Sequence, residues 1–397
     1  MNGDVDREAA DSLSRREFNQ RAALASSAMF LAGVDGAARQ GASDAKPHVV
    51  NMSRADDALD EGLELLKSYG PEYGGGLANH GPMAAEALCA MGRGSAIVPW
   101  VKRYKRNLEE LPLATKKIAA DEWKSALGDA SRTGDWIVLM EREVAEGSWE
   151  SALDQWLARL SPGFAAAAAH GAIRTGHAAR SLAARDTPLR RRELAHGLAY
   201  WAAQYQELPI ATQASAQRLS VSDALAHVEL VPNERRFRGG SITHGLQALG
   251  NWPQFATVAD LADTSGDPSK FLSELTHVFA GVYFDQANIV GQRIQFVHAV
   301  TGPSALRLML PHVKPETARA ALPYAWQTSA GIYAAFGAPK KPYEYSGRTD
   351  EPDLVDHAVK NGDEHAIKFT EVCLREHALN AQAIYLVAAR DACRHLA

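Results

Sequence analysis

The stretch ADDALDEGLELLKSY, residues 55–69, shows most clearly the pattern that decides the fold. Wound as a helix, it brings four apolar side chains around one face: Leu59, Leu63, Leu65 and Leu66. Asp56 and Asp57 suit the first turn of such a helix, where the backbone N–H groups make the potential positive. The stretch therefore predicts an amphipathic helix with one buried side.

Similar amphipathic or alanine-rich runs recur along the chain, while the alternation typical of strands is almost absent. We predict further helices over residues 82–91, 100–110, 135–145, 149–160, 165–184, 189–207, 222–228, 255–262, 268–284, 288–300, 302–310, 315–336, 351–361 and 364–394. Residues 208–250 have weaker periodicity and are expected to form a connector. The predicted fold is mainly α: a large, single, bundle-like helical domain over residues 46–397, with few or no strands.

The composition is that of an ordinary globular protein. A chain of 397 residues with 46% hydrophobic composition can bury a substantial core. Its formal net charge of −5, from 42 basic and 47 acidic side chains, gives no reason to expect nucleic acid as a partner. Cys89, Cys373 and Cys393 have no CxxC spacing, which argues against a disulfide framework and against a thiolate zinc site.

Five widely spaced segments place a histidine or a lysine beside small or helix-forming residues. They are Asn79–Pro82, His170–Arg174, Thr276–His277, His298–Thr301 and Asp363–Lys368. Histidine is the commonest metal ligand in proteins and a usual proton carrier. A single histidine is more often an ordinary core or surface residue, but the five segments together predict one metal site.

The N-terminal residues resemble a twin-arginine export signal. Ser14–Phe18, SRREF, precedes a moderately apolar run over residues 22–34 that is too short to span a bilayer, and small residues follow at 36–42. We therefore predict a signal peptide and leader over residues 1–45, export by the Tat machinery to the periplasm or beyond, and no stable transmembrane segment. A polar leader with two arginines by chance is the alternative.

Four motifs carry a resemblance to a known family. In chain order they are Asn79–Leu88, Phe164–Arg174, His298–Thr301 and Asp363–Lys368. Their order and wide spacing resemble the questin oxidase-like family of fungal polyketide pathways and its bacterial relatives, from about residue 55 to about residue 395. No single motif is as specific as a phosphate-binding loop, so the resemblance rests on the set.

The resemblance implies a mostly helical fold and an O2-dependent, Baeyer–Villiger-like cleavage of a carbon–carbon bond in a quinone-type aromatic polyketide. It also implies a mononuclear iron held by four histidines and by a lysine carboxylated on its side-chain nitrogen. Carried over residue by residue, these ligands are His80, His170, His277, His298 and Lys368. The threonine that assists the carboxylated lysine corresponds to Thr301. A need for NADPH is left open.

The residue types agree with such a site. Imidazole nitrogens and a carbamate oxygen suit Fe(II), although Mn, Co, Ni and Zn compete for the same ligands. Burial of Lys368 would lower its pKa and make a neutral amine available to CO2. On a helix, Thr301 lies three residues after His298 and shares its face. His365 and Glu364 lie three and four residues before Lys368, and either could orient the lysine or simply pair with it.

Two further residues follow His170 on its helix. His177 lies seven residues on, about 10 Å along the axis, which is too far for both imidazoles to bind one ion. We assign His177 a catalytic role near the substrate as a hypothesis, with a structural role as the alternative. Arg174 could meet a phenolate or carboxylate of the substrate, or form a structural salt bridge.

The predicted function is that of an exported, non-heme Fe(II)-dependent oxygenase whose partners are O2 and a small aromatic or quinone substrate. A metal-dependent hydrolase is one alternative, because lysine carbamates also occur in hydrolytic metal sites. Such sites usually contain several aspartates, and the motifs offer few. A non-catalytic helical binding protein of the periplasm is the other alternative.

Overall fold

Helices make up nearly all the regular structure of the computed structural model, which describes residues 52–119, 121–211, 217–237, 241–290, 293–339 and 353–396. These residues contain 16 α-helices and one two-stranded sheet. The prediction of a mainly α fold with few strands is therefore confirmed. The predicted leader, residues 1–45, lies outside the described residues.

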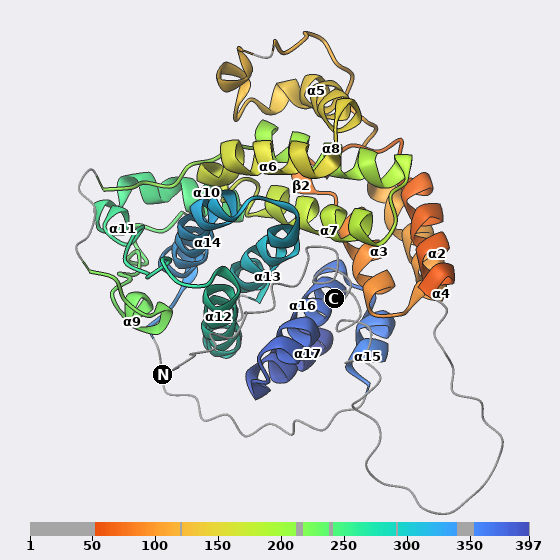
Figure 1. The fold of residues 1–397 in the computed structure, drawn as a ribbon. Coiled ribbons are helices and arrows are strands. Elements are labelled where there is room, and N and C mark those ends of the chain that lie inside the picture. The colour runs from red at the N-terminus through yellow and green to blue at the C-terminus, as the bar shows by residue number, and fades with distance from the viewer. Residues whose placement is uncertain are drawn as a thin grey trace, which may run out of the picture. The chain divides into compact units, whose positions relative to one another are not determined.

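The elements are labelled as in Figure 1. The α-helices are α2 (Met52–Leu66), α3 (Gly81–Ala90), α4 (Gly94–Tyr104), α5 (Thr133–Glu146), α6 (Trp149–Leu160), α7 (His170–Ala184), α8 (Pro188–Ala203), α9 (Val221–Ala226), α10 (Ile242–Gln247), α11 (Pro253–Ala256), α12 (Pro268–Val290), α13 (Arg293–Met309), α14 (Pro315–Phe336), α15 (Leu354–Asn361), α16 (Glu364–Leu379) and α17 (Ala383–His395). The strands β1 (Glu72–Tyr73) and β2 (Leu77–Ala78) form an antiparallel hairpin just before α3.

Four helices, α3, α7, α13 and α16, form a central bundle (Figure 1). α3 packs against α7, α7 against α13, α13 against α16, and α16 against α3, so each helix contacts two others. Glycine allows the closest of these approaches. A Cβ at Gly176 of α7 would lie 2.5 Å from the carbonyl oxygen of Ala305 on α13. A larger side chain there would push the two helices apart.

The outer helices bury their apolar faces against the central bundle and against each other. Leu59, Leu63 and Leu66 of α2 are buried in a cluster shared with α3 and α4, as the amphipathic pattern predicts. α8 packs against both α7 and α5, and its fully buried Trp201 donates a hydrogen bond of 2.9 Å to the carbonyl of Gly163. The packing encloses the first turns of α3 and α7.

The prediction of one helix over residues 165–184 is wrong at its start. Ala167, Ala168 and Ala169 have φ values of 46°, 58° and 68°, and α7 begins only at His170. Alanine is the strongest helix former, so local propensity favours a right-handed helix here. Tertiary packing overrides it, because the three residues are enclosed by neighbouring helices.

Other helix boundaries also differ from the prediction: α4, for example, begins at Gly94 and ends at Tyr104, in place of the helix predicted over residues 100–110. Residues 302–310 do not form a separate helix, since α13 continues through Pro303. The Ala299 carbonyl, which cannot receive an N–H from Pro303, accepts the Ser329 hydroxyl at 2.8 Å instead. The single helix predicted over residues 364–394 is two helices, because Asn380 adopts an extended conformation and ends α16.

The segment predicted as a connector, residues 208–250, contains the short helices α9 and α10 in its described part. Within the described residues, no helix combines the length and the apolar composition that crossing a membrane requires.

Candidate metal centre

Four histidines from the central bundle lie together at the N-terminal part of their helices. His80 immediately precedes α3, His170 is the first residue of α7, His298 lies in the second turn of α13, and His365 is the second residue of α16. The ring centroids are 4.6 Å apart for His80 and His170, 4.6 Å for His170 and His298, 5.6 Å for His298 and His365, and 4.5 Å for His365 and His80. The four imidazoles therefore form a closed cycle, which we call the histidine cluster.

In the histidine cluster, the Nε2 atoms of His170 and His298 face each other. The Nδ1 atom of His170 bonds the carbonyl oxygen of Ala167, and Nδ1 of His298 bonds that of Ile294 at 2.6 Å. A carbonyl oxygen only accepts, so both Nδ1 atoms carry the proton of the neutral ring. The two Nε2 atoms, only 3.1 Å apart, then both present lone pairs. That contact is repulsive unless a cation lies close to both nitrogens.

His80 is held by its backbone, and its ring nitrogen is left without a partner. Asn79 accepts the N–H of Gly81 at 2.9 Å and donates to the carbonyl of Gly70 at 2.8 Å, which fixes the turn into α3. The backbone N–H of His80 donates to the Tyr104 hydroxyl at 2.8 Å. Nδ1 of His80 is buried and has no hydrogen-bond partner. Such an orphaned buried atom indicates an unseen ligand.

His365 enters the histidine cluster from the start of α16. Asp363 caps this helix by accepting the N–H groups of His365 at 2.8 Å and Ala366 at 3.1 Å. The ring Nδ1 of His365 has no hydrogen-bond partner, although it lies 3.5 Å from an Asp363 carboxylate oxygen. One nitrogen each of His80, His170 and His365 lie within 4.8 Å of one another.

Lys368 is buried at the same place, one turn after His365 on α16. It is 1% exposed, and burial lowers the pKa of its amine to about 8, against the opposing effect of Glu364 and Asp363. Its charge in turn contributes to the low pKa of His80, His170 and His298. The site thus holds a lysine whose neutral form is accessible near neutral pH.

Burial is the main cause that lowers the pKa of His80, His170 and His298 well below the usual value. These imidazoles are therefore neutral at physiological pH, which is the form that binds metals. Two nitrogens bound to one ion at about 2.1 Å lie at most about 4.2 Å apart. The nitrogens of His80, His170 and His365 need only a small contraction to meet that limit, and Nε2 of His298 lies 3.1 Å from Nε2 of His170, so the donor set fits one borderline metal ion such as Fe(II).

The structure places the predicted site residues in different surroundings. His80, His170, His298 and Lys368 come together, whereas His277 on α12 lies beside Tyr385, with ring centroids 6.3 Å apart. No described ring contact links His277 to the histidine cluster. Its place is taken by His365, which the sequence analysis considered only as an aid to the lysine.

Thr301 and His177 lie on the central helices but outside the histidine cluster. The buried hydroxyl of Thr301 donates to the carbonyl of Val297 at 3.0 Å, so it must rotate before it can donate to Lys368. Nδ1 of His177 lies 2.6 Å from a Glu86 carboxylate oxygen. Arg174 forms a two-point ion pair with Glu193 at 2.6 and 2.8 Å, the structural alternative considered for it.

The signal that could have identified His365 was its spacing from Lys368. Residues three apart share a helix face, so a lysine ligand at 368 brings His365 to the same side. The loose pattern around His277 gives no comparable geometric argument. Residues 79–373 match the family model described as questin oxidase-like, and a search of curated proteins gave no match.

Proposed function

Since the chain belongs to the questin oxidase-like family, whose name indicates an oxidase or oxygenase, we propose that it is a non-heme, iron-dependent oxygenase of quinone-type aromatic substrates. The matched region includes all four members of the histidine cluster and Lys368. The cleavage of a ring carbon–carbon bond by O2, Baeyer–Villiger-like in outcome, is the reaction that we propose within this class.

The observation that carries the proposal is the 3.1 Å contact between the Nε2 atoms of His170 and His298. Both Nδ1 protons are committed to backbone carbonyls, and both rings are too deeply buried to be protonated. A metal cation close to both lone pairs removes the repulsion. A purely structural histidine pair would instead be expected to share a proton or to separate.

The residues that would hold the iron are His80, His170, His298, His365 and Lys368 as its carbamate. Addition of CO2 to the neutral amine of Lys368 forms an N–C bond and releases one proton, which leaves an anionic oxygen ligand. When bound, an iron ion with these ligands supplies one-electron chemistry with O2. This assignment replaces His277 with His365 in the ligand set.

The remaining steps belong to the chain itself. The carbonyls of Ala167 and Ile294 fix the orientation of two imidazoles, so that their Nε2 atoms point inward. Burial of the His80, His170 and His298 rings, with the His365 side chain 12% exposed, keeps most bulk water from the reacting centre. Thr301, after rotation of its hydroxyl away from Val297, would donate a hydrogen bond to the carbamate of Lys368.

Elemental analysis and oxygen consumption test this function. We expect about one iron per chain after purification under reducing conditions, and O2 uptake with a panel of hydroxyanthraquinones. Stoichiometric zinc without O2 uptake would favour a hydrolase instead. A protein without bound metal after incubation with Fe(II) would refute the proposed centre and favour a binding role.

We also propose that the chain is exported through the twin-arginine route, on the evidence of Ser14–Phe18 alone. Residues 1–45 fused to a reporter should direct it to the periplasm, and Arg15→Lys/Arg16→Lys should keep it in the cytoplasm. Fractionation of cells that express both fusions measures this. Equal export of the two fusions would contradict the proposal.

A further inference from the structure

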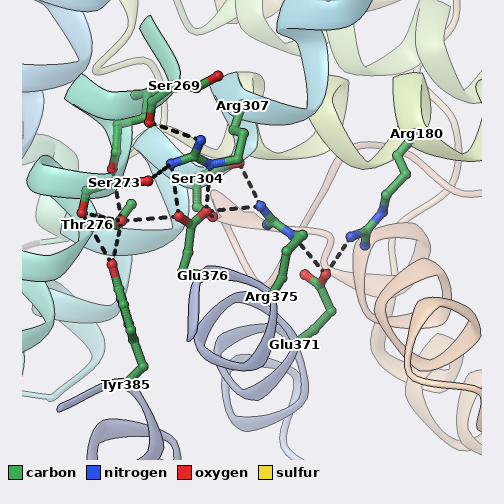
Figure 2. A network of polar contacts seen from close by, with 11 residues as sticks. Arg180, Ser269, Ser273, Thr276, Ser304, Arg307, Glu371, Arg375, Glu376 and Tyr385 are labelled. Carbon is green, nitrogen blue, oxygen red and sulfur yellow. Dashed lines mark hydrogen bonds and ion pairs between the residues drawn. The ribbon is translucent and has the colours of Figure 1, made fainter. Parts of the chain in front are cut away.

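A chain of charges of alternating sign, made of buried carboxylates and partly buried guanidinium groups, crosses the central bundle below the histidine cluster. Its members, which we call the charge ladder, are Glu86, Arg180, Glu371, Arg375, Glu376 and Arg307. Figure 2 shows most of it as a continuous line of ion pairs, from Arg180 at one end to Arg307 at the other. Three carboxylates and three guanidinium groups balance, so the charge ladder is neutral as a whole.

Arg180 of α7 joins two carboxylates from two other helices. Its Nε and Nη2 atoms donate to the two oxygens of Glu86 on α3, at 2.7 and 2.5 Å. Its Nη1 donates to Glu371 on α16. Glu86 also contacts Nδ1 of His177, at 2.6 Å. One side chain thus connects three of the four central helices.

The other end of the charge ladder connects α16 with α13 (Figure 2). Arg375 donates to Glu371 and to Glu376, at 3.0 Å in each case. Arg307 of α13 donates to both oxygens of Glu376, at 3.1 and 3.0 Å. Ser304 of α13 adds a hydrogen bond of 2.6 Å to the same carboxylate. All four central helices are therefore linked in one network.

The helices that meet in the charge ladder are those that carry the histidine cluster. Along each helix the ladder residue follows the histidine by a similar interval: Glu86 follows His80 by six residues, Arg180 follows His170 by ten, Arg307 follows His298 by nine and Glu371 follows His365 by six. At 1.5 Å per residue these intervals are roughly 9–15 Å. The charge ladder is thus a second layer of contacts between the same four helices, beneath the first.

Opposite charges in this layer stabilise the ionised forms of their neighbours. Burial alone would raise the pKa of Glu371, but the guanidinium groups of Arg180 and Arg375 outweigh it and hold that pKa well below its usual value. Likewise, burial would lower the pKa of Arg180, but Glu371 and Glu86 raise it. Glu371 and Arg180 therefore both remain charged near neutral pH. Loss of one partner would leave the next charge buried and unpaired, which is costly.

We propose that the charge ladder, and Arg180 in particular, positions the four ligand-bearing helices so that the imidazoles are gathered before the metal arrives. Arg180 is then a positioning residue, which acts on the metal centre only through the helices. The inference rests on the proposed metal centre. It explains why the four imidazole rings stay within contact of one another.

The test uses charge-balanced variants of the full chain and Co(II) as the probe. Arg180→Met/Glu371→Gln removes one positive and one negative charge from the charge ladder. The matched control is Arg190→Met/Asp60→Asn, because Arg190 of α8, like Arg180, pairs with two carboxylates, here Asp56 and Asp60 of α2. Neither α2 nor α8 carries a member of the histidine cluster.

Both double variants should melt at a lower temperature than the wild type. Only Arg180→Met/Glu371→Gln should bind Co(II) at least tenfold more weakly and shift its visible absorption spectrum. Arg180→Lys keeps the positive charge but loses the several N–H donors of the guanidinium group. Its Co(II) affinity should lie between that of the double variant and that of the wild type. Wild-type affinity and spectrum in the Arg180 variants, or an equal loss in the control, would overturn the inference.

A measurement on the wild type keeps the inference testable if the double variant fails to fold. Amide exchange in the first turns of α7, α13 and α16 should remain slow after the metal is removed. Rapid exchange there in the metal-free protein would show that the metal itself gathers the helices. Failure of the wild type to bind Co(II) or Fe(II) at all would instead refute the metal centre, independently of the charge ladder.

Discussion

The role of each histidine in the proposed metal centre depends on whether one of its two ring nitrogens is already hydrogen-bonded. His170 commits Nδ1 to the carbonyl of Ala167 in the turn before α7, and His298 commits Nδ1 to the carbonyl of Ile294 on α13, so only Nε2 is left for a ligand. Nδ1 of His80 lacks any hydrogen bond and is free to coordinate, whereas Nδ1 of His365, which also makes no hydrogen bond, lies 3.5 Å from an Asp363 carboxylate oxygen. The cluster therefore mixes rings fixed by the backbone with rings that the metal itself would fix.

This difference leads to a prediction about ligand identity. His365→Ala should abolish stoichiometric iron binding, because it removes one of the four clustered imidazoles. His277→Ala should keep full metal content, since its ring lies beside Tyr385. Iron per chain, measured on both purified variants, decides the matter. Loss of iron in His277→Ala with normal iron in His365→Ala would restore the assignment made from the sequence.

The lowered pKa of Lys368 leads to a second prediction about the metal ligands. With a pKa of about 8, its amine is partly neutral at physiological pH and can add CO2. Lys368→Ala should lose most of its iron affinity, and a short carboxylate such as propionate should restore part of it by supplying the missing anionic oxygen. Iron titrations with and without propionate measure this. A variant that binds iron normally without any carboxylate would contradict the carbamate assignment.

At the scale of helices, the N-termini of α3, α7 and α16 converge on the histidine cluster. Each N-terminus carries a partial positive charge, which favours an anion beside it. A carbamate at Lys368 gains from this field, as would an anionic oxygen of the substrate. The arrangement thus helps to explain why an anionic ligand would accompany the four imidazoles.

The left-handed turn at residues 167–169 is the costliest local structure near the site. A non-glycine residue in this conformation costs about 1–2 kcal/mol. Ala168→Gly should therefore change the free energy of unfolding by less than about 1 kcal/mol, because relief of strain offsets the added chain entropy. Ala172→Gly, in the regular part of α7, should destabilise by about 1 kcal/mol or more. Urea denaturation measures the free energy of unfolding of both variants. An equal decrease in the two would contradict the argument.

The helices themselves were largely predictable, because their apolar periodicity is local information. What the sequence could not show is the tertiary override at Ala167–Ala169, where the best helix formers leave the helix. The same limit applies to the charge ladder. Glu371 and Arg375 have the spacing of a helix ion pair, but nothing local indicates that Arg180, nearly two hundred residues earlier, completes it.

For the whole molecule, the charge ladder couples stability to pH. The pKa values of Glu86 and Glu371 are lowered in the folded protein from an ordinary value of 4.5. Their contribution is present above about pH 4.5 and is lost as the pH falls below it toward the folded pKa values. We expect the free energy of unfolding to drop between pH 5 and pH 3, as measured by urea denaturation. The drop should be smaller in Arg180→Met/Glu371→Gln, and an equal drop would contradict this origin.

The dispersal of the metal centre along the chain has a consequence for biosynthesis. A nascent polypeptide that has left the ribosome only as far as α13 carries His80, His170 and His298, but neither His365 nor Lys368. Iron present at that stage would find only three of the five proposed ligands. Under the proposed function, loading would therefore be a late event, and a bound ion would mean that the last helices have already packed against the bundle.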